Sequence, residues 1–344
     1  MLRIGCFACV VLLLVGRAFA EPQPTEGTPG PYRVVKTIPL GGDGGWDYLT
    51  VDPQRKLAYV PRSTYTQVVS LTDGKLVATI PGIKRGHGSC VVPQLGRGFI
   101  TDGVGAIVQV FDLKSNQLLG AIPSVPDVDG IIYDPGSNKV LTVSGDGGTL
   151  IPISPDVDPR NGHPESPLPL GGSPEFLAAD GAGKAYVNVM DKGYVAVVDT
   201  KAMKLLDKWP VAPGGDPVGM SIDPKNGRLF IGCRKPQKLI VMSTADGKIL
   251  ADLPIGPSVD ATHFDNGYIL ATCGDSTMAV AKETSPGKFA IVQTVPTGPG
   301  SRTMGFDPTT HTVYLPGADY EPPAAGDKPK MKPGSFKLIV ISRD

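Results

Sequence analysis

The sequence predicts an all-β fold, because the chain is rich in turn-forming residues and its apolar residues fall in many short runs. Glycine (44) and proline (35) make up almost a quarter of the 344 residues, about twice their usual share. Both residues interrupt helices, while a hydrophobic content of 41% and a net charge of zero argue against disorder. We therefore expect many short strands joined by tight turns.

One unit recurs along the chain: a short apolar strand, a turn, and a second apolar strand. The turn is usually Asp-Pro, as at Asp52-Pro53 and Asp134-Pro135. Seven such turns follow one another at intervals of 40–46 residues, with anchor positions at 52, 92, 134, 180, 223, 265 and 307. Regular spacing of this length indicates one structural unit repeated along the whole chain.

Each unit contains four predicted strands. In the first unit, the strand that ends at Asp52 is followed by apolar runs at 57–60, 67–71 and 76–81. The turn at Asp73-Gly74 supplies the positive-φ residues that a tight hairpin needs. Four antiparallel strands in 40–50 residues are typical of a blade of a β-propeller. The sequence therefore predicts a single seven-bladed β-propeller over residues 32–344.

The two ends of the repeat array complement each other. The last unit has only three strands, and residues 32–39 form an apolar N-terminal strand that lacks a unit of its own. We expect this strand to close the last blade, because closure removes free sheet edges. Two insertions interrupt the period, at 155–167 between strands three and four of blade 3 and at 316–334 between strands two and three of blade 7.

Residues 1–20 have the pattern of a cleaved signal peptide. Arg3 precedes an apolar run over 4–16, and Ala18-Phe19-Ala20 forms a cleavage signal before Glu21. The apolar run is too short to span a bilayer, and no later stretch approaches that length. Residues 21–31 form a proline-rich lead-in. We expect an exported protein, periplasmic or secreted, without a transmembrane segment, and a monomer.

Charge and cysteine content weigh against a nucleic-acid-binding protein and a zinc protein. Lys+Arg and Asp+Glu are both 33, which weighs against a nucleic-acid partner, since such proteins carry a basic face. Beyond the signal, Cys90, Cys233 and Cys273 remain, with no C-x-x-C motif among them, so no zinc site is implied. Cys233 and Cys273 end equivalent strands of adjacent blades, and the sequence leaves open whether they are packed thiols or a disulfide.

These repeats resemble the YncE-like, YVTN-repeat β-propeller family. The segments that carry the resemblance are 45–53 (GWDYLTVDP), 73–81 (DGKLVATIP) and 185–188 (AYVN). The resemblance covers essentially the whole mature chain and implies seven blades and an exported location. It implies little about chemistry, because it supplies no catalytic motif that could be carried over to residues of this sequence.

Alignment of the innermost strands on their anchors reveals a ring of ionisable residues. The residue five positions before each anchor starts its strand and should lie at one mouth of the central channel. These residues are Asp47, His87, Asp129, Glu175, Val218, Asp260 and Arg302. Charged residues make up only 19% of the chain, so this row is strongly enriched. Trp46, beside Asp47, either lines a ligand site or belongs to the core.

Four carboxylates at one channel mouth have chemical consequences. Like charges raise one another's pKa or recruit a cation. We expect Asp47, Asp129, Glu175 and Asp260 to bind a Ca²⁺-like divalent cation or the cationic group of a ligand; no other cofactor is implied. His87, Glu175 and Asp260 are the candidate catalytic residues if the funnel is an active site. The alternative is that these residues are only solvated, or cap loop amides.

Three functions remain open at this point. The first is a binding module that presents the acidic funnel to a small molecule, a glycan or a protein. The second is a metal-assisted lactonase, lyase or isomerase, which rests on analogy between folds. The third is a structural cell-surface propeller. The sequence contains no G-x-S-x-G elbow, P-loop or H-E-x-x-H motif, and it does not identify the ligand.

Overall fold

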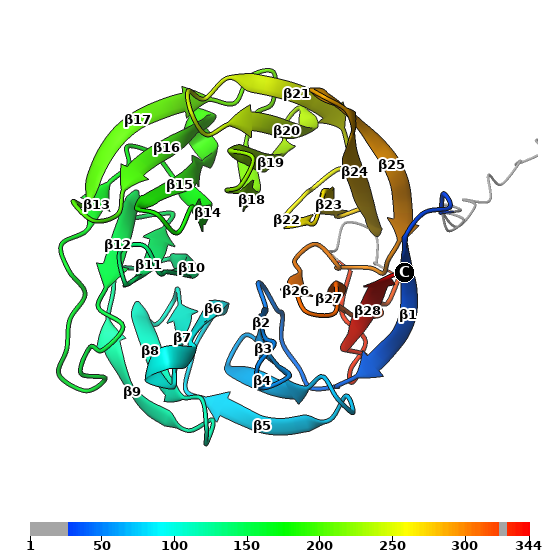
Figure 1. The fold of residues 1–344 in the computed structure, drawn as a ribbon. Helices are drawn as coiled ribbons and strands as arrows, with labels where there is room; N and C mark the ends of the chain where they lie inside the picture. The colour runs from blue at the N-terminus through cyan, green and yellow to red at the C-terminus, as the bar shows by residue number, and fades with distance from the viewer. Residues whose placement is uncertain (1–26, 323–328) are drawn as a thin grey trace, which may run out of the picture.

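Seven four-stranded antiparallel sheets form a ring around a central axis in the computed structural model, which describes residues 27–322 and 329–344 (Figure 1). This arrangement confirms the predicted seven-bladed β-propeller. The signal peptide predicted over 1–20, and residues 21–26 of the lead-in, lie outside the described residues. Within the described ranges, no helix is long and apolar enough to cross a bilayer.

Every blade begins with its innermost strand and, except for the last, proceeds outward in chain order. Blade 1 comprises β2 (Thr50–Asp52), β3 (Leu57–Pro61), β4 (Tyr65–Ser70) and β5 (Leu76–Pro81); blade 2, β6 (Gly86–Val92), β7 (Arg97–Asp102), β8 (Ile107–Asp112) and β9 (Leu118–Pro123); blade 3, β10 (Val128–Asp134), β11 (Lys139–Ser144), β12 (Thr149–Ile153) and β13 (Leu168–Pro169). Blade 4 comprises β14 (Pro174–Ala179), β15 (Lys184–Val189), β16 (Tyr194–Asp199) and β17 (Lys204–Pro210); blade 5, β18 (Pro217–Asp223), β19 (Arg228–Arg234), β20 (Gln237–Ser243) and β21 (Ile249–Pro254); blade 6, β22 (Ala261–Asp265), β23 (Tyr268–Cys273), β24 (Thr277–Ser285) and β25 (Lys288–Pro296). Blade 7 comprises β26 (Gly305–Asp307), β27 (Thr312–Gly317), β28 (Lys337–Arg343) and, outermost, β1 (Tyr32–Pro39), and two single-turn 3₁₀ helices lie at Pro93–Leu95 and Met190–Lys192.

The N-terminal strand closes the ring, as the sequence predicted. Strand β1 pairs antiparallel with β28, so the first and last described strands share one sheet. Asp265 of blade 6 fastens this closure: it accepts a hydrogen bond from the Tyr32 hydroxyl (2.5 Å), and its carboxylate lies 2.6 Å from His311 Nδ1 and 3.1 Å from Arg343. Three segments of blade 7 therefore converge on one buried carboxylate.

The anchor aspartates recur because all of them except Asp265, which fastens the closure, organise the turn after an innermost strand. The Asp52 carboxylate accepts the backbone N–H groups of Gln54 and Arg55, both at 3.1 Å. Asp134 does the same for the two residues that follow its proline. Such turns satisfy the backbone donors locally, and both aspartates are buried. The repeated Asp-Pro signal in the sequence is therefore a repeated turn in the structure.

The core lies between neighbouring blades rather than at the channel. One apolar cluster, for example, packs Phe99 and Val110 of blade 2 against Val140 and Ile151 of blade 3. The two insertions extend the connections between β12 and β13 and between β27 and β28, the connections that the sequence indicated. All three described cysteines are buried and free, so Cys233 and Cys273 are packed thiols and not a disulfide.

Candidate functional site

A charged pocket of about 310 Å³ lies at one mouth of the central channel, where the innermost strands begin. Every blade contributes at least one ionisable side chain. These residues are Asp47, Arg85, His87, Asp127, Asp129, Glu175, Arg234, Asp260 and Arg302. Six of them belong to the ring that the sequence predicted, and Trp46 also lines the pocket. Val218, the seventh ring position, is buried and does not line it.

Irregular pairing and glycine bring these side chains together. The ladders of β6, β10, β14 and β18 each shift register at the ring position, and such bulges redirect a side chain. The next residue is often glycine: a Cβ on Gly130 would lie 2.7 Å from the Glu175 carbonyl, and one on Gly219 would lie 2.9 Å from the Asp260 carbonyl. Only glycine therefore permits adjacent inner strands to approach so closely.

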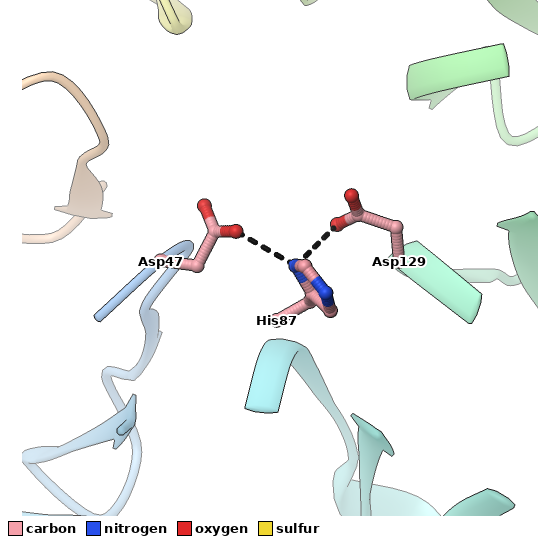
Figure 2. A group of neighbouring side chains, drawn as sticks. All are labelled: Asp47, His87 and Asp129. Atoms are coloured by element: carbon pink, nitrogen blue, oxygen red, sulfur yellow. Dashed lines mark hydrogen bonds and ion pairs between the residues drawn. The ribbon is translucent and has the colours of Figure 1, made fainter. Parts of the chain in front are cut away.

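His87 is the centre of one charged group. Its Nδ1 lies 2.8 Å from Asp47 Oδ2 and 3.4 Å from Asp129 Oδ1 (Figure 2), and the residue is 4% exposed. Burial lowers the pKa of His87, but the hydrogen bond to Asp47 and the charges of Asp129 and Asp47 outweigh it and raise that pKa above its ordinary value. The protonated imidazole therefore neutralises part of the carboxylate charge.

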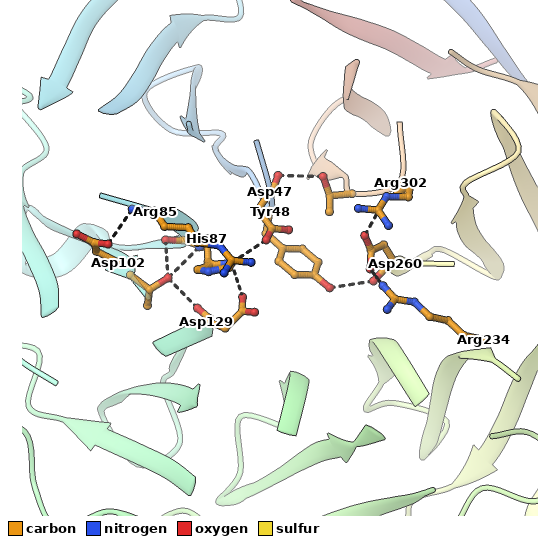
Figure 3. Close-up of polar contacts among 12 residues, drawn as sticks. Asp47, Tyr48, Arg85, His87, Asp102, Asp129, Arg234, Asp260 and Arg302 are labelled. Atoms are coloured by element: carbon orange, nitrogen blue, oxygen red, sulfur yellow. Dashed lines mark hydrogen bonds and ion pairs between the residues drawn. The ribbon is translucent and has the colours of Figure 1, made fainter. Parts of the chain in front are cut away.

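Asp260 is the centre of a second group, on the other side of Tyr48 in the view of Figure 3. Arg234 Nη2 forms an ion pair with its Oδ1, and Arg302 Nε lies 3.4 Å from its Oδ2. Burial raises the pKa of the Asp260 carboxyl, opposed by the charges of Arg302 and Arg234. The Tyr48 hydroxyl donates to the Asp260 backbone carbonyl at 2.9 Å. This carboxylate is therefore paired twice by arginine.

Glu175 stands apart from both groups. Among the described residues, no side chain forms a hydrogen bond or ion pair with its carboxyl. Burial raises the pKa of Glu175 to about 7, with Arg234 lowering it and Asp260 and Asp47 raising it. A half-buried carboxyl without a partner in a charged pocket has unused capacity to bind a donor or a cation.

A buried arginine shapes the loop that delivers Trp46 and Asp47. Arg62 is fully buried and lies 3.6 Å from the centroid of the Phe336 ring. Its guanidinium donates to the backbone carbonyls of residues 41–45, the best of these at 2.7 Å, and to the Gln67 side chain at 3.0 Å. The Gly-rich loop therefore wraps around one side chain. Trp46 packs on Phe336 with centroids 5.0 Å apart, so it both contacts the core and lines the pocket.

The predicted ring missed Arg85, Asp127, Arg234 and Tyr48. Arg85 and Asp127 stand seven residues before their anchors, so extension of the same alignment by two positions would have found them. Arg234 lies at the end of the second strand of its blade. An alignment of the innermost strands alone does not include that position. The additional charged groups are two arginines and one aspartate, so the mouth is somewhat less acidic than the ring alone suggested.

The residues proposed as metal ligands separate into different environments. Among the described residues, ligand atoms of Asp47, His87 and Asp129 lie within 4.8 Å of one another, and no group of this kind includes Glu175 or Asp260. The closest donor set is therefore two carboxylates and one imidazole, not four carboxylates. Imidazole with carboxylate suits Zn²⁺ or Mn²⁺, whereas Ca²⁺ prefers oxygen ligands alone.

The fold and this pocket define a seven-bladed β-propeller with a charged central site. Solved structures of the same architecture include hydrazine synthase from Kuenenia stuttgartiensis (TM-score 0.69, 13% identity, 81% of this chain and 92% of that one). The WD40 repeats of RRP9 are also similar (TM-score 0.71, 12% identity, 90% of this chain and 97% of that one). At such identities the likeness shows the fold alone. No family model matches the chain, and no curated protein matches its sequence.

Proposed function

We propose that the chain is a binding module of the YncE-like type whose central pocket binds a small polar ligand with a cationic group. The observation that carries the proposal is the unpartnered Glu175 carboxyl in a pocket to which all seven blades contribute charge. His87 and the arginines already neutralise much of the charge on Asp47, Asp129 and Asp260. An ammonium or guanidinium group is the complement that Glu175 lacks.

The size and chemistry of the pocket support a small ligand. Its volume of about 310 Å³ lies at the lower end of the range for small-molecule sites, about 300–1,000 Å³. Charged groups line it on all sides, so a ligand must offer hydrogen bonds in several directions. The proposal includes an exported location, which rests on the signal-peptide pattern at residues 1–20 alone.

Calorimetric titration with small cationic compounds (methylamine, a diamine and guanidine) is expected to give saturable binding to the wild-type chain. Glu175→Gln should weaken this binding at least about tenfold, because a charge-assisted hydrogen bond is worth roughly 1.5–3 kcal/mol. Glu321→Gln, at an exposed position of the blade 7 insertion, is the matched control and should bind as wild type. A parallel titration with neutral sugars separates a glycan ligand, which would bind while the cationic compounds do not. Failure of all three cationic compounds to bind would contradict the proposal.

A second function is favoured by the cluster of Asp47, His87 and Asp129, whose ligand atoms are close enough to share one ion. We propose it as a site for Zn²⁺ or Mn²⁺, which would supply the Lewis acid that a lactonase, lyase or isomerase requires. His87 would then act as a neutral nitrogen ligand, and the two carboxylates would provide oxygen ligands.

Metal titration after chelation distinguishes this second function from the first. His87→Asn is expected to weaken Zn²⁺ or Mn²⁺ binding at least about tenfold, because the variant loses one of three protein ligands. The exposed His163 in the blade 3 insertion provides the control variant His163→Asn. Equal metal affinity in both variants would show that the ion binds elsewhere.

A further inference from the structure

The opposite end of the channel carries a second pocket of different chemistry, which we call the apolar pocket. It has a volume of about 440 Å³ and lies where the innermost strands end. Its walls are mainly apolar and come from the last residues of four adjacent inner strands, among them Tyr133, Ala179, Ile222 and Phe264. The charged pocket lies where three of these strands begin: Asp129 and Glu175 lie at the start of β10 and β14, and Asp260 immediately precedes β22. The lining therefore changes from polar to apolar along the propeller axis.

A stacked aromatic pair separates the two pockets. Tyr48, from the loop before β2, and Phe176, from β14, meet across the channel with ring centroids 4.4 Å apart and planes inclined by 29°. Tyr48 lines both pockets, and Phe176 lines the apolar one. The hydrogen bond from the Tyr48 hydroxyl to the Asp260 carbonyl holds the ring in place. The apolar pocket therefore has an aromatic floor.

The apolar pocket contains almost no free charge. Asp180 lines it, but its carboxylate accepts three backbone N–H groups of the following turn at 2.8–3.0 Å. Burial lowers the pKa of His263 to about 4, so its imidazole is neutral at neutral pH. The Tyr133 hydroxyl already bonds to Asn138 at 2.8 Å. An anionic ligand would find no counter-charge here and a cationic one only Asp180, whose Oδ1 is already used by the turn, so desolvation of an ion would be costly.

His263 supplies a polar group that is free to orient a ligand, as does Ser221, whose hydroxyl also lines the pocket and has no hydrogen-bond partner among the described residues. The His263 ring packs on Phe306 with centroids 4.0 Å apart and planes inclined by 32°. Within the described residues, no hydrogen bond to its ring nitrogens is formed. A neutral imidazole offers one donor and one acceptor. Two inclined aromatic pairs, together with this hydrogen-bonding edge, favour a flat ring system over a flexible chain.

We propose that the apolar pocket is a second binding site. Its ligand would be an uncharged planar molecule that carries a hydroxyl or amine on its ring. A ligand of this class would stack on the Tyr48–Phe176 floor, contact Ile222 and Phe264, and hydrogen bond to His263. A volume of about 440 Å³ suits such a molecule. The inference is independent of the function proposed for the charged pocket, because it depends on different side chains except for Tyr48.

The test uses N-phenyl-1-naphthylamine, an uncharged aromatic probe whose planar naphthalene fluoresces in apolar surroundings. We expect saturable binding of one probe per chain and displacement by 1-naphthol. Ile222→Glu, which places a charge in the wall, should weaken binding at least about tenfold. Leu206→Glu, on the exposed face of outer strand β17, is the matched control and should bind as wild type.

A second variant keeps the test decisive if Ile222→Glu does not fold. His263→Phe preserves an aromatic wall and removes the hydrogen bond, so 1-naphthol should lose affinity while naphthalene should not. Several results would overturn the proposal: no saturable binding, equal binding to the Ile222→Glu and Leu206→Glu variants, or displacement by a long-chain alcohol but not by 1-naphthol. The last result would identify an acyl-chain site.

Discussion

Replacement of Arg62 by methionine is expected to destabilise the propeller by about 3 kcal/mol or more. The guanidinium is fully buried and satisfies carbonyl groups along residues 41–45. Methionine fills a similar space but offers no donor, and each buried acceptor left without a partner costs about 1–3 kcal/mol. Water that enters the gap would satisfy some of these carbonyl groups. The expected destabilisation is therefore well below the sum of the costs of the individual unpaired carbonyls.

Urea unfolding followed by circular dichroism measures the effect. Arg160→Met, at an exposed position of the blade 3 insertion, is the matched control and should unfold at the wild-type midpoint. Arg62→Lys, which retains the charge but has a different donor geometry, should fall between the two. A midpoint for Arg62→Met equal to that of Arg160→Met would show that the loop does not depend on the guanidinium.

Replacement of Glu175 by glutamine is expected to stabilise the ligand-free chain above neutral pH. Burial raises the pKa of this carboxyl from an ordinary 4.5 to about 7, so the folded chain binds the proton more tightly than the unfolded chain does. The contribution of Glu175 to stability is therefore complete below pH about 4.5 and is lost as pH rises through about 7. Glutamine resembles the protonated form at every pH, and the gain above pH 7 should be about 2–3 kcal/mol.

Unfolding free energies at pH 4.5, 6 and 8 check this expectation. The difference between Glu175→Gln and wild type should be near zero at the lowest pH and largest at pH 8. His87 does not contribute to this difference, because both proteins retain it. Its raised pKa lowers the stability of both proteins as pH rises. Glu321→Gln should show no such trend. A constant difference across the range would mean that Glu175 is solvated and unperturbed in its environment.

The sequence predicted those features that depend on local turns and on the period of the repeat. The buried carboxylates of Asp52 and Asp134 fix the turns at the ends of their inner strands, and counting back from such anchors locates equivalent positions. That count was sufficient to bring His87 and Asp129 to one mouth of the channel. It also located the strand that closes the ring, because the last unit lacked one.

Contacts across the channel, and contacts between an innermost strand and the second strand of a neighbouring blade, could not be predicted in this way. Tyr48 belongs to blade 1 and Phe176 to blade 4, and only the closed ring brings their side chains into contact. Arg234 reaches Asp260 of the next blade from the end of a second strand. A single row of inner positions contained four carboxylates and one arginine, and it therefore overstated the negative charge of the mouth.

The position of Tyr48 between the two pockets has a thermodynamic consequence. Any occupant of either pocket that displaces this ring, or that strengthens its hydrogen bond to the Asp260 carbonyl, changes a wall of the other pocket as well. Linkage requires the effect to be reciprocal: if an apolar molecule alters the affinity for a cation by some factor, the cation alters the affinity for the apolar molecule by the same factor. If both proposed sites bind ligands, Tyr48 would therefore couple two ligands that never touch.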